Sequence, residues 1–558
     1  MSSNMFKLTA ISAMILSTTS ASAALYQVIE VKPQTTFAFE SVYGVAIQPG
    51  KVVGGNSLGC FADGTTDCES SFKLAGETRL VATHAGQAID GLSYREEAPF
   101  GIDNGFIYVQ DDERDFERYC RTDLRYAICE TWADIRWNVW KKEINGDQTP
   151  NAIAFIEGQA TPIDETKNVV VNSLTANAEP IGITLTPGDV TGSRRNSVKA
   201  LVANTSINID AGLQTRAWKT DGTYTVGSIA HEKTNNQGNF YTSKGAIWDS
   251  LGTMTEIPWQ TTNTERDNRL AQGSLRDVTV KDGNIYAVGY NTFYDDRNFM
   301  QASVSSVKVG ESNWITKPVT GATVRENGTG GDFIHSHSLL TAVNEHGIAI
   351  GEAKLSRAES GAYANRLFVV PDINDPKANF LNGSLFFAGA GGKAGAINNF
   401  NEIVGQIDTE ETREVGGKPR RKRGFIYPYG TELQGSVPER QAIFNNRAWL
   451  LDDLTNGSEF SDNNQYRIIA ANDINDAGVI AATALKCTGG YDSTAHNAQC
   501  GAGKGQEKTV AVKLVPIAGK THEDISPRGM DDLVVERNGA GLGLWSLILG
   551  GLLWFRRK

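Results

Sequence analysis

Short apolar stretches separated by polar turns recur along most of the chain. The clearest units are residues 342–351 (AVNEHGIAIG), 396–405 (AINNFNEIVG) and 473–482 (DINDAGVIAA), with shorter-turn versions at 46–54 and 280–286. In each unit, apolar and often β-branched residues flank a polar centre whose Gly or Asn tolerates the left-handed conformation of a tight turn. The pattern therefore predicts strand, turn, strand. The Gly after the second apolar run suits a bulge or close backbone packing.

A second element follows several of these units. It is a small-then-aromatic strand, seen at residues 216–218, 245–248, 366–369, 424–427 and 447–450. Two such elements make a four-stranded meander, and the steps from Gly289 to Gly351 and on to Gly405 are 62 and 54 residues, near the blade length of a propeller with loops. A meander cannot bury both faces alone, so stacking around an axis is expected. We predict an all-β, β-propeller-like array of four-stranded meander repeats over residues 24–518.

The ends of this array are predicted to join. Residues 26–31 and 509–515 both have the pattern of strands. Pairing the first strand with the last in one sheet removes exposed sheet edges. We expect that closure, with residues 519–538 as a linker beyond it.

One segment, about residues 114–144, breaks the β pattern and predicts a helical insertion. Thr122 and Asp123 would cap a helix running to about Ile144, on which apolar residues recur every three or four positions: Leu124, Ile128, Trp132, Ile135 and Val139. Cys120 before this helix and Cys129 within it would tether its start. Trp132, Trp137 and Trp140 would either bind a sugar ring or hydrophobic partner, or simply pack on the flank of the fold.

The first 23 residues have the layout of a secretory signal peptide. Lys7 precedes a short apolar helix, and Ala21-Ser22-Ala23 is a small-x-small site. The apolar stretch is shorter than a membrane span. We expect cleavage between Ala23 and Ala24. The alternative is a buried N-terminal helix.

Residues 539–558 are predicted to form a hydrophobic C-terminal helix with a basic end. Gly539 and Gly541 precede an uncharged run that stops at Arg556, Arg557 and Lys558, which favour a cytoplasmic end. This layout resembles the GlyGly-CTERM sorting tail of Gram-negative bacteria, although Gly539-Ala540-Gly541 stands where a Gly-Gly pair is usual. The resemblance implies export and sorting machinery as partners, a rhomboid-type protease among them, and transient membrane attachment before release to the cell surface or medium. The alternative is a plain membrane anchor.

The repeats also carry a resemblance. An Ile-Asn-x-x-Gly-x-Ile-Val-Gly-like hairpin followed by a small-aromatic strand resembles the HAF-type extracellular repeat. With both end signals, the chain looks like a family of uncharacterised exported Gram-negative proteins, classed only as a domain of unknown function. The first third fits least well. The resemblance brings no activity, cofactor or catalytic residue.

Composition and cysteines narrow the picture further. The 58 Gly, 16 Pro and 21% charged residues suit a turn-rich β protein, and the net charge of −11 argues against nucleic acid as a partner. The six cysteines form three near pairs, and local disulfides are expected because the export route is oxidising. They are Cys60 with Cys68, Cys120 with Cys129, and Cys487 with Cys500.

Catalytic and metal signals are weak. Gly55 to Gly59 matches the GxSxG elbow around Ser57, but no helix signal follows it. His335 and His337 would lie on one strand face as a metal pair, although hydrogen-bonding roles explain them as well. Asp111, Asp112 and Asp115 form an acidic cluster that suits calcium or a solvated loop, whereas residues 473–478 resemble half a calcium loop but lack the downstream Glu. The sequence requires no cofactor.

Residues 418–423 (KPRRKR) are a strong basic run, either a grip for an anionic partner or an exposed, protease-sensitive loop. The preferred function is a non-enzymatic, exported repeat protein that binds an unknown protein or glycan, or serves as an envelope scaffold. The alternative is a propeller-type hydrolase or lyase acting on an extracellular polymer. Acids, His or Arg gathered from several repeats in one pocket would favour the enzyme, and an axis lined by turn Asn and Gly alone would exclude it.

Overall fold

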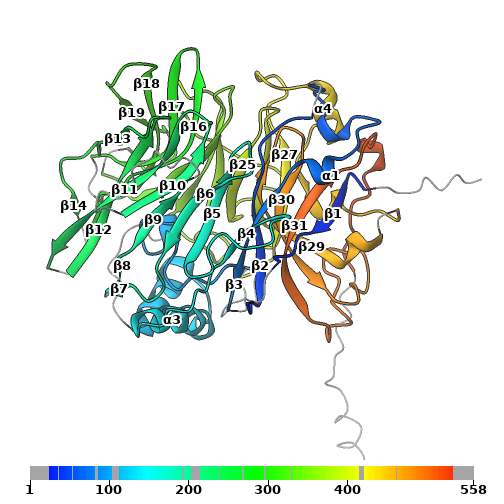
Figure 1. The fold of residues 1–558 in the computed structure, drawn as a ribbon, viewed down its shortest axis with the longest axis horizontal. Helices are drawn as coiled ribbons and strands as arrows, with labels where there is room; N and C mark the ends of the chain where they lie inside the picture. The colour runs from blue at the N-terminus through cyan, green and yellow to red at the C-terminus, as the bar shows by residue number, and fades with distance from the viewer. Residues whose placement is uncertain are drawn as a thin grey trace, which may run out of the picture.

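The computed structural model describes residues 24–531 apart from 35–36, 53–54, 82–85, 104–111, 192–193, 203–213, 237, 267–268, 295–296, 329, 414–419 and 460. Strands dominate this part of the chain, and helices are few and short (Figure 1). The predicted all-β class is confirmed.

Seven antiparallel sheets, numbered I to VII in chain order, hold most of the strands. Sheets I and II contain β2 (Ser41–Ile47), β3 (Leu74–Arg79) and β4 (Ala154–Ile156), then β5 (Asn168–Leu174), β6 (Pro180–Leu185) and β9 (Val198–Leu201). Sheets III and IV contain β10 (Gln214–Thr220), β11 (Thr225–Asn235), β12 (Gly238–Trp248) and β13 (Met254–Ile257), then β16 (Ser274–Lys281), β17 (Asn284–Thr292), β18 (Met300–Lys308) and β19 (Ile315–Pro318).

Sheet V contains β20 (Val324–Arg325), β21 (Phe333–Val343), β22 (Ala349–Leu355), β23 (Asn365–Val370) and β24 (Asn379–Phe380). Sheet VI contains β25 (Gly392–Ile397), β26 (Glu402–Asp408), β27 (Lys422–Pro428) and β28 (Trp449–Leu450). Sheet VII contains β29 (Tyr466–Ile474), β30 (Ile480–Cys487), β31 (Glu507–Pro516) and β1 (Tyr26–Glu30). Two ribbons complete the set: β7 (Val190–Thr191) with β8 (Arg194–Arg195), and β14 (Glu265–Arg266) with β15 (Arg269–Leu270).

Each sheet packs on the next one along the chain. In order, β2 contacts β5, β6 contacts β10, β10 contacts β16, β16 contacts β21, β21 contacts β25 and β25 contacts β29. The sequence of contacts then returns to its start, because β2 also contacts β29 and β30. The apolar core is accordingly split into layers between neighbouring sheets, for example between IV and V and between VI and VII.

The two ends of the described chain meet in sheet VII. Strand β1 pairs antiparallel with β31, and Tyr26 lies opposite Pro516. The predicted pairing of the first and last strands is confirmed. Beyond β31 the chain packs back on the sheet: Arg528 is buried and its Nε donates a 2.6 Å hydrogen bond to the Asp452 carbonyl oxygen. The beginning of the expected linker is therefore part of the packed body.

In every sheet the first strand, or in sheet V the second strand β21, carries a β-bulge near the residue that pairs with the repeat Gly or Ala. Strands β21 and β29 each have a further register shift. The residues left out of the ladder beside the repeat Gly or Ala are called the seven bulge residues: Val45, Asn172, Trp218, Arg276, Thr341, Gly395 and Asn472. The residue opposite each bulge on the next strand is Gly76, Gly182, Gly227, Gly289, Gly351, Gly405 or Ala482. A Cβ atom on Gly227 or Gly289 would overlap a backbone carbonyl oxygen of the first strand. The recurrent Gly of the sequence repeat thus makes room for the bulge.

The first Asn of the repeated turn closes that turn with its side-chain oxygen. In sheet VI, Oδ1 of Asn398 accepts hydrogen bonds of 3.0 Å from the backbone N–H groups of Phe400 and Glu402, closing the turn. Oδ1 of Asn344 does the same for His346 and Ile348 in sheet V. The side-chain amide is left to reach the neighbouring sheet.

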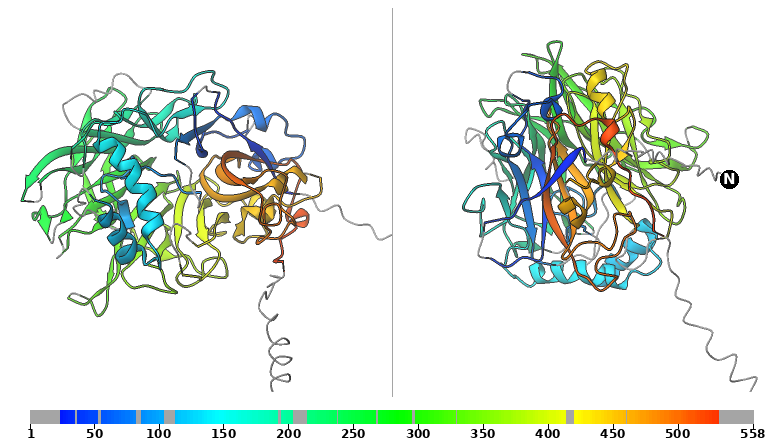
Figure 2. Two further views of the ribbon diagram at one scale, coloured as in Figure 1. Left: turned by 90° about the horizontal axis from the view of Figure 1, so that it is seen from below. Right: turned by 90° about the vertical axis from the view of Figure 1, so that its right-hand side faces the viewer.

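The helices are α1 (Cys68–Ser71), α2 (Glu113–Tyr119), α3 (Glu130–Ile144), α4 (Pro438–Ile443) and α5 (Leu451–Leu454). The expected single helix from Thr122 to Ile144 is wrong at its start. A π-helical turn (Cys120–Leu124) follows α2, and Arg125 then adopts a left-handed conformation with φ of +60°. The chain becomes helical again only at Glu130. Figure 2 shows α2 and α3 lying across one end of the strands.

Candidate binding cavity

A cavity of about 550 Å³ lies among the first strands of the seven sheets. All seven bulge residues line it, so every sheet contributes one residue that the bulge turns toward this space. Residues of α2, α3 and the π-helical turn line part of it, including Tyr119, Trp132 and Arg136. The remaining wall comes from residues 86–103, which precede α2.

Residues 86–103 are fixed to the cavity wall by their carboxylates. Glu97 is buried and accepts hydrogen bonds from Arg276 (2.9 Å), Ser228 (2.9 Å) and the Tyr290 hydroxyl (2.7 Å). Glu96 accepts from the same guanidinium at 2.8 Å. Burial would raise the pKa of Glu97, but Arg276, Arg216 and the hydroxyl hydrogen bonds together outweigh burial and lower the pKa. Residues 86–103 therefore place ionised carboxylates next to Arg276, the bulge residue of sheet IV.

A second ion pair secures the end of the same segment. Asp103 accepts hydrogen bonds from Lys354 Nζ (3.0 Å) and Asn365 Nδ2 (3.1 Å). Burial opposes ionisation of Asp103, but Lys354, Lys422 and Asn365 together outweigh burial and lower the pKa. Both partners lie on sheet V. Residues 86–103 thus link sheets IV and V across the cavity.

Near Lys219, two carboxyls are buried, and neighbouring positive charge does not fully offset the cost of ionising them. Asp277 accepts backbone hydrogen bonds from Val278 (2.8 Å) and Val343 (3.0 Å), and burial raises its pKa to about 6 although Lys219 opposes this. Asp473 lies 3.9 Å from Lys219 Nζ, and burial raises its pKa as well. All three residues follow bulges and line the cavity.

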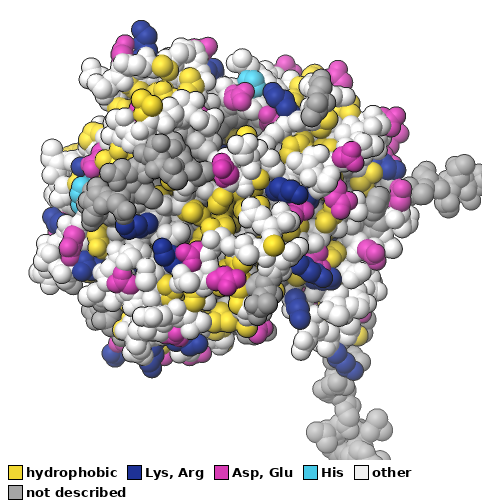
Figure 3. Space-filling view, viewed as in Figure 1, with side chains coloured by type: hydrophobic (Ala, Val, Ile, Leu, Met, Phe, Trp, Pro, Cys, Tyr) yellow, Lys and Arg dark blue, Asp and Glu magenta, His cyan; other side chains and the backbone are white. Residues whose placement is uncertain are grey.

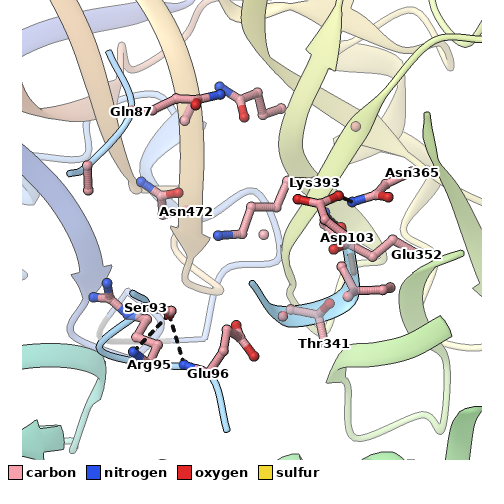
Figure 4. A pocket seen from close by; sticks show the side chains of 18 of the residues that line it. Gln87, Ser93, Arg95, Glu96, Asp103, Thr341, Glu352, Asn365, Lys393 and Asn472 are labelled. Atoms are coloured by element: carbon pink, nitrogen blue, oxygen red, sulfur yellow. Dashed lines mark hydrogen bonds between the residues drawn. The ribbon is translucent and has the colours of Figure 1, made fainter. Parts of the chain in front are cut away.

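Glu352 and Lys393 face the cavity from sheets V and VI. Oε2 of Glu352 accepts a 3.1 Å hydrogen bond from the backbone N–H of Ala394. Burial raises the pKa of Glu352 to about 7, and Lys393 is the main group opposing that shift. Figure 4 shows the Lys393 side chain extending into the open space between Asn472, Arg95 and Glu96. The cavity therefore combines a carboxyl that titrates near neutrality with an extended ammonium group.

The predicted metal candidates are not brought together. His335 stacks on Phe380, whereas His337 packs edge-on against Phe299 and its Nδ1 accepts a 3.1 Å hydrogen bond from the Met300 N–H. Burial lowers the pKa of His335 to about 4 and of His337 to about 3. Within the described residues, no group of three or more His, Cys, Asp or Glu side chains has a metal-binding arrangement.

The described residues of the acidic cluster lie at the N-terminus of α2. Asp111 lies outside the described residues. Asp112 caps α2 by accepting from the Asp115 N–H at 3.2 Å, and it pairs with Arg114 at 2.7 Å. Asp115 pairs with Arg118 at 2.8 Å.

Two further sequence motifs have structural explanations. Ser57 is exposed in a loop that leads into a single 3₁₀ turn (Gly59–Phe61), so the strand-to-helix setting of a nucleophile elbow is absent there. In the basic run, Lys418 and Pro419 lie outside the described residues, but the expectation of a wholly exposed loop is wrong for the rest. Arg420 and Arg423 are buried and pair with Asp408 (3.4 Å) and Asp452 (2.8 Å). On the face in Figure 3, cationic and anionic side chains are interspersed.

Two of the three tryptophans of the helical insertion are buried, and Trp137 is half-buried. Trp132 and Trp140 are buried with Phe116, Tyr119 and the Cys120–Cys129 disulfide. The packing interpretation therefore describes them, although Trp132 also reaches the cavity wall, where Arg136 lies 4.1 Å from its ring centre.

All three predicted disulfides are present: Cys60–Cys68, Cys120–Cys129 and Cys487–Cys500. They fit an oxidising, extracellular or periplasmic location. Residues 1–23 and the sorting-tail residues Gly539, Gly541, Arg556, Arg557 and Lys558 lie outside the described residues, while Ala24 is buried beside β1. None of the helices in the described part of the chain has the length and apolar character of a membrane span.

Sequence reasoning missed the cavity residues. A usable signal existed, because Glu77, Glu352 and Gln406 each follow the Gly opposite a bulge. Their side chains reach the first strand of the next sheet: Glu77 accepts from Val171 N–H (2.7 Å) and Gln406 donates to the Ile469 carbonyl oxygen (2.9 Å). In these three sheets, the polar residue directly after the repeat Gly therefore lines the cavity.

The architecture defines an all-β repeat protein with a charged central cavity. A family model described as "Protein of unknown function (DUF3466)" matches residues 200–558. The chain belongs to this family. No curated protein matches the sequence.

Similar solved structures are distant. A crystal structure of a protein of unknown function from Dyadobacter fermentans DSM 18053 has 8% identity and a TM-score of 0.30, with 61% of this chain and 84% of that chain covered. A Trypanosoma rangeli sialidase in complex with the inhibitor DANA has 8% identity and a TM-score of 0.29, with 88% of this chain and 60% of that chain covered. The same sialidase in complex with sialic acid has 8% identity and a TM-score of 0.29, with 89% of this chain and 60% of that chain covered. These scores carry no argument about function.

Proposed function

We propose that this protein is an exported, seven-bladed β-propeller that binds a small polar ligand in its axial cavity. The propeller arrangement is supported by contacts that run from sheet I through sheet VII and return to β2. It is also supported by the bulges, which place one residue of every sheet at the same cavity. Sheet VII, built from both ends of the chain, would be the closing blade.

The cavity itself carries the binding proposal. Its volume of about 550 Å³ falls within the range typical of small-molecule sites, roughly 300–1,000 Å³. Polar side chains from different sheets face it, and the ion pairs of Glu97 and Asp103 keep its wall in place. A preorganised polar wall lowers the entropic cost of binding a polar ligand.

Ligand binding can be tested by calorimetry on the full chain with a panel of sugars, sugar acids and amino acids. Thr341→Phe would fill the cavity from the bulge of sheet V, and Thr341→Ser is the matched control. We expect at least one compound to bind the parent and the Ser variant but not the Phe variant. Equal binding by all three proteins would contradict a cavity site.

The export half of the proposal rests on the disulfides and the sequence signals. Its test is cell fractionation followed by intact-mass measurement of the native protein. We expect a chain that starts at Ala24, lies outside the cytoplasm and ends near Gly539–Gly541. An intact C-terminus on an exported chain would favour the plain anchor, and an uncleaved cytoplasmic chain would contradict export.

A hydrolase or lyase acting on an extracellular polymer is the second candidate. The observation that favours it is Glu352, whose pKa of about 7 suits a general acid, in a cavity that Asp277, with a pKa of about 6, also lines. Acids and bases from several sheets do gather in one cavity, as this candidate requires. Its test is incubation with envelope and extracellular polysaccharides. Cleavage by the parent that Glu352→Gln abolishes and Asp332→Asn leaves unchanged would favour the enzyme, because Asp332 lies away from the cavity lining.

A further inference from the structure

We infer that the ligand of this cavity is a small, hydroxyl-rich monocarboxylate, such as a sugar acid, whose carboxylate pairs with Lys393. This inference rests on the proposed binding function and names its ligand class. It starts from the distribution of charge on the cavity wall.

The other lysines and arginines that line the cavity are already engaged. Arg95 pairs with Glu77, Arg276 with Glu96 and Glu97, and Lys354 with Asp103. Lys219 lies 3.9 Å from Asp473, and Lys422 lies 3.9 Å from Asp408. Arg136 donates to the Trp132 carbonyl oxygen and lies over its ring.

Lys393 differs from all of these. Among the described residues, its ammonium has no hydrogen-bond or ion-pair partner, although its charge lowers the pKa of the Glu352 carboxyl. The side chain is exposed to the cavity and extends into its open middle (Figure 4). Lys393 is thus an extended cation whose neighbouring cations, apart from Arg136, lie close to carboxylates, and it is suited to one negative charge on a ligand.

A monocarboxylate fits this charge better than a phosphate or sulfate cluster. A dianion would meet Glu96, Glu352 and the Asp277–Asp473 pair with a single free ammonium to compensate it. The hydroxyl-rich class follows from the other groups around Lys393. Gln87, Ser93, Thr341, Asn365 and Asn472 line the same space and offer amides and hydroxyls (Figure 4). Such groups recognise ligand hydroxyls through neutral hydrogen bonds.

The test uses the full chain and two matched sugar pairs, D-galacturonate with D-galactose and D-glucuronate with D-glucose. Within each pair the acid differs from the neutral sugar in having a carboxylate in place of a hydroxymethyl group. Affinities are measured by calorimetry for the parent, Lys393→Met, Lys393→Arg and the surface control Lys32→Met, whose parent lysine is exposed. A tri-galacturonate arm distinguishes a free sugar acid from the end of an acidic polymer.

We expect at least one acid to bind about tenfold or more tightly than its neutral partner, since hydrogen bonds to charged groups contribute about 1.5–3 kcal/mol. Lys393→Met should abolish that preference, Lys393→Arg should keep part of it, and Lys32→Met should keep all of it. Equal affinity for acid and neutral sugar, or an acid preference that survives Lys393→Met, would overturn the inference while leaving cavity binding intact. If no sugar acid binds but another compound gives Thr341→Phe-sensitive binding, the ligand class is wrong and the binding function stands. If nothing in either panel binds, both fail.

Discussion

The side-chain amide of Asn398 donates a 3.1 Å hydrogen bond to the backbone carbonyl oxygen of Asn475, the residue at the same turn position in the next sheet. Asn344 makes the same 3.1 Å bond to the Asn398 carbonyl, and Asn475 makes it to the Gln48 carbonyl. The repeated Asn therefore closes its own turn with Oδ1 and ties sheets V, VI, VII and I together with Nδ2.

Replacing this Asn should loosen two adjacent sheets at once. Asn398→Ala removes two acceptor bonds within the turn, the donor bond to Asn475 and a 2.6 Å bond to Glu402. At about 1 kcal/mol for each net hydrogen bond, we expect a loss of about 2–4 kcal/mol in the free energy of unfolding. Denaturant titration measures it. Asn382→Ala, at an exposed position, should change stability by less than about 0.5 kcal/mol, and a similar loss in both variants would rule out the inter-sheet role.

The Gly opposite a bulge should not tolerate a side chain. In Gly227→Ala the new Cβ atom would overlap the Arg216 carbonyl oxygen, so β10 and β11 must separate. We expect a loss of about 2–3 kcal/mol in stability, as for other overpacked sites. The matched change Gly529→Ala meets open space and should be near neutral. Thermal unfolding of the two variants checks this, and a stable Gly227→Ala protein would show that the bulge can relax.

The buried Glu97 carboxylate should destabilise the fold once Arg276 is removed. Arg276→Met leaves Glu97 buried without its ion pair, with the hydroxyl donors of Ser228 and Tyr290 and the nearby charge of Arg216. Breaking a buried ion pair from one side costs about 3–5 kcal/mol. Adding Glu97→Gln should recover part of this loss because the buried charge is gone. Denaturant unfolding of the single and double variants gives the comparison; a double variant less stable than Arg276→Met would contradict the pairing.

His337 should make the fold sensitive to acid. Burial lowers its pKa from 6.5 to about 3 in the folded state, so the unfolded chain takes up a proton near pH 6.5 that the folded protein does not. Stability is therefore full above about pH 6.5 and falls as the pH drops toward 3, by about 2 kcal/mol at pH 5.

The check is stability at pH 7 and pH 5 for the parent and His337→Asn, in which the amide oxygen can still accept from Met300 N–H. We expect the variant to lose about 1–2 kcal/mol less than the parent between these two pH values. His522→Asn, at an exposed site, should lose as much stability between pH 7 and pH 5 as the parent does. Parallel curves for all three proteins would show that His337 is not the acid-sensitive group.

Local signals in the sequence predicted the local structure. The turns at 344–347 and 398–401 formed from Asn and Gly preferences, the cysteines paired over short loops, and the Gly289, Gly351 and Gly405 spacing tracked successive bulges. The first sheets were not recognised, because Gly76 and Gly182 are separated by the insertion that contains α2 and α3, which hides the period.

The cavity could not be predicted, for a physical reason. In a regular strand, side chains alternate between faces, and each bulge shifts that alternation by one residue. Arg276 and Thr341 reach the cavity because of such shifts, while Lys393 and Glu352 meet there only after sheets V and VI pack. The ion pairs of Arg420 with Asp408 and of Arg423 with Asp452 likewise form only in the fold, so two arginines of a basic run that looked exposed are buried.

The pairing of β1 with β31 has a consequence for how the molecule is made. Tyr26 is synthesised among the first residues of the described body and Pro516 among the last, so sheet VII is incomplete until the chain is almost finished. Until then β1 has an unpaired edge, and the apolar layer between sheets VI and VII lacks Val512 and Leu514. Such a long-range closure slows folding and leaves the growing chain open to wrong pairing. Completion of this apolar layer is therefore among the last events that the order of synthesis allows.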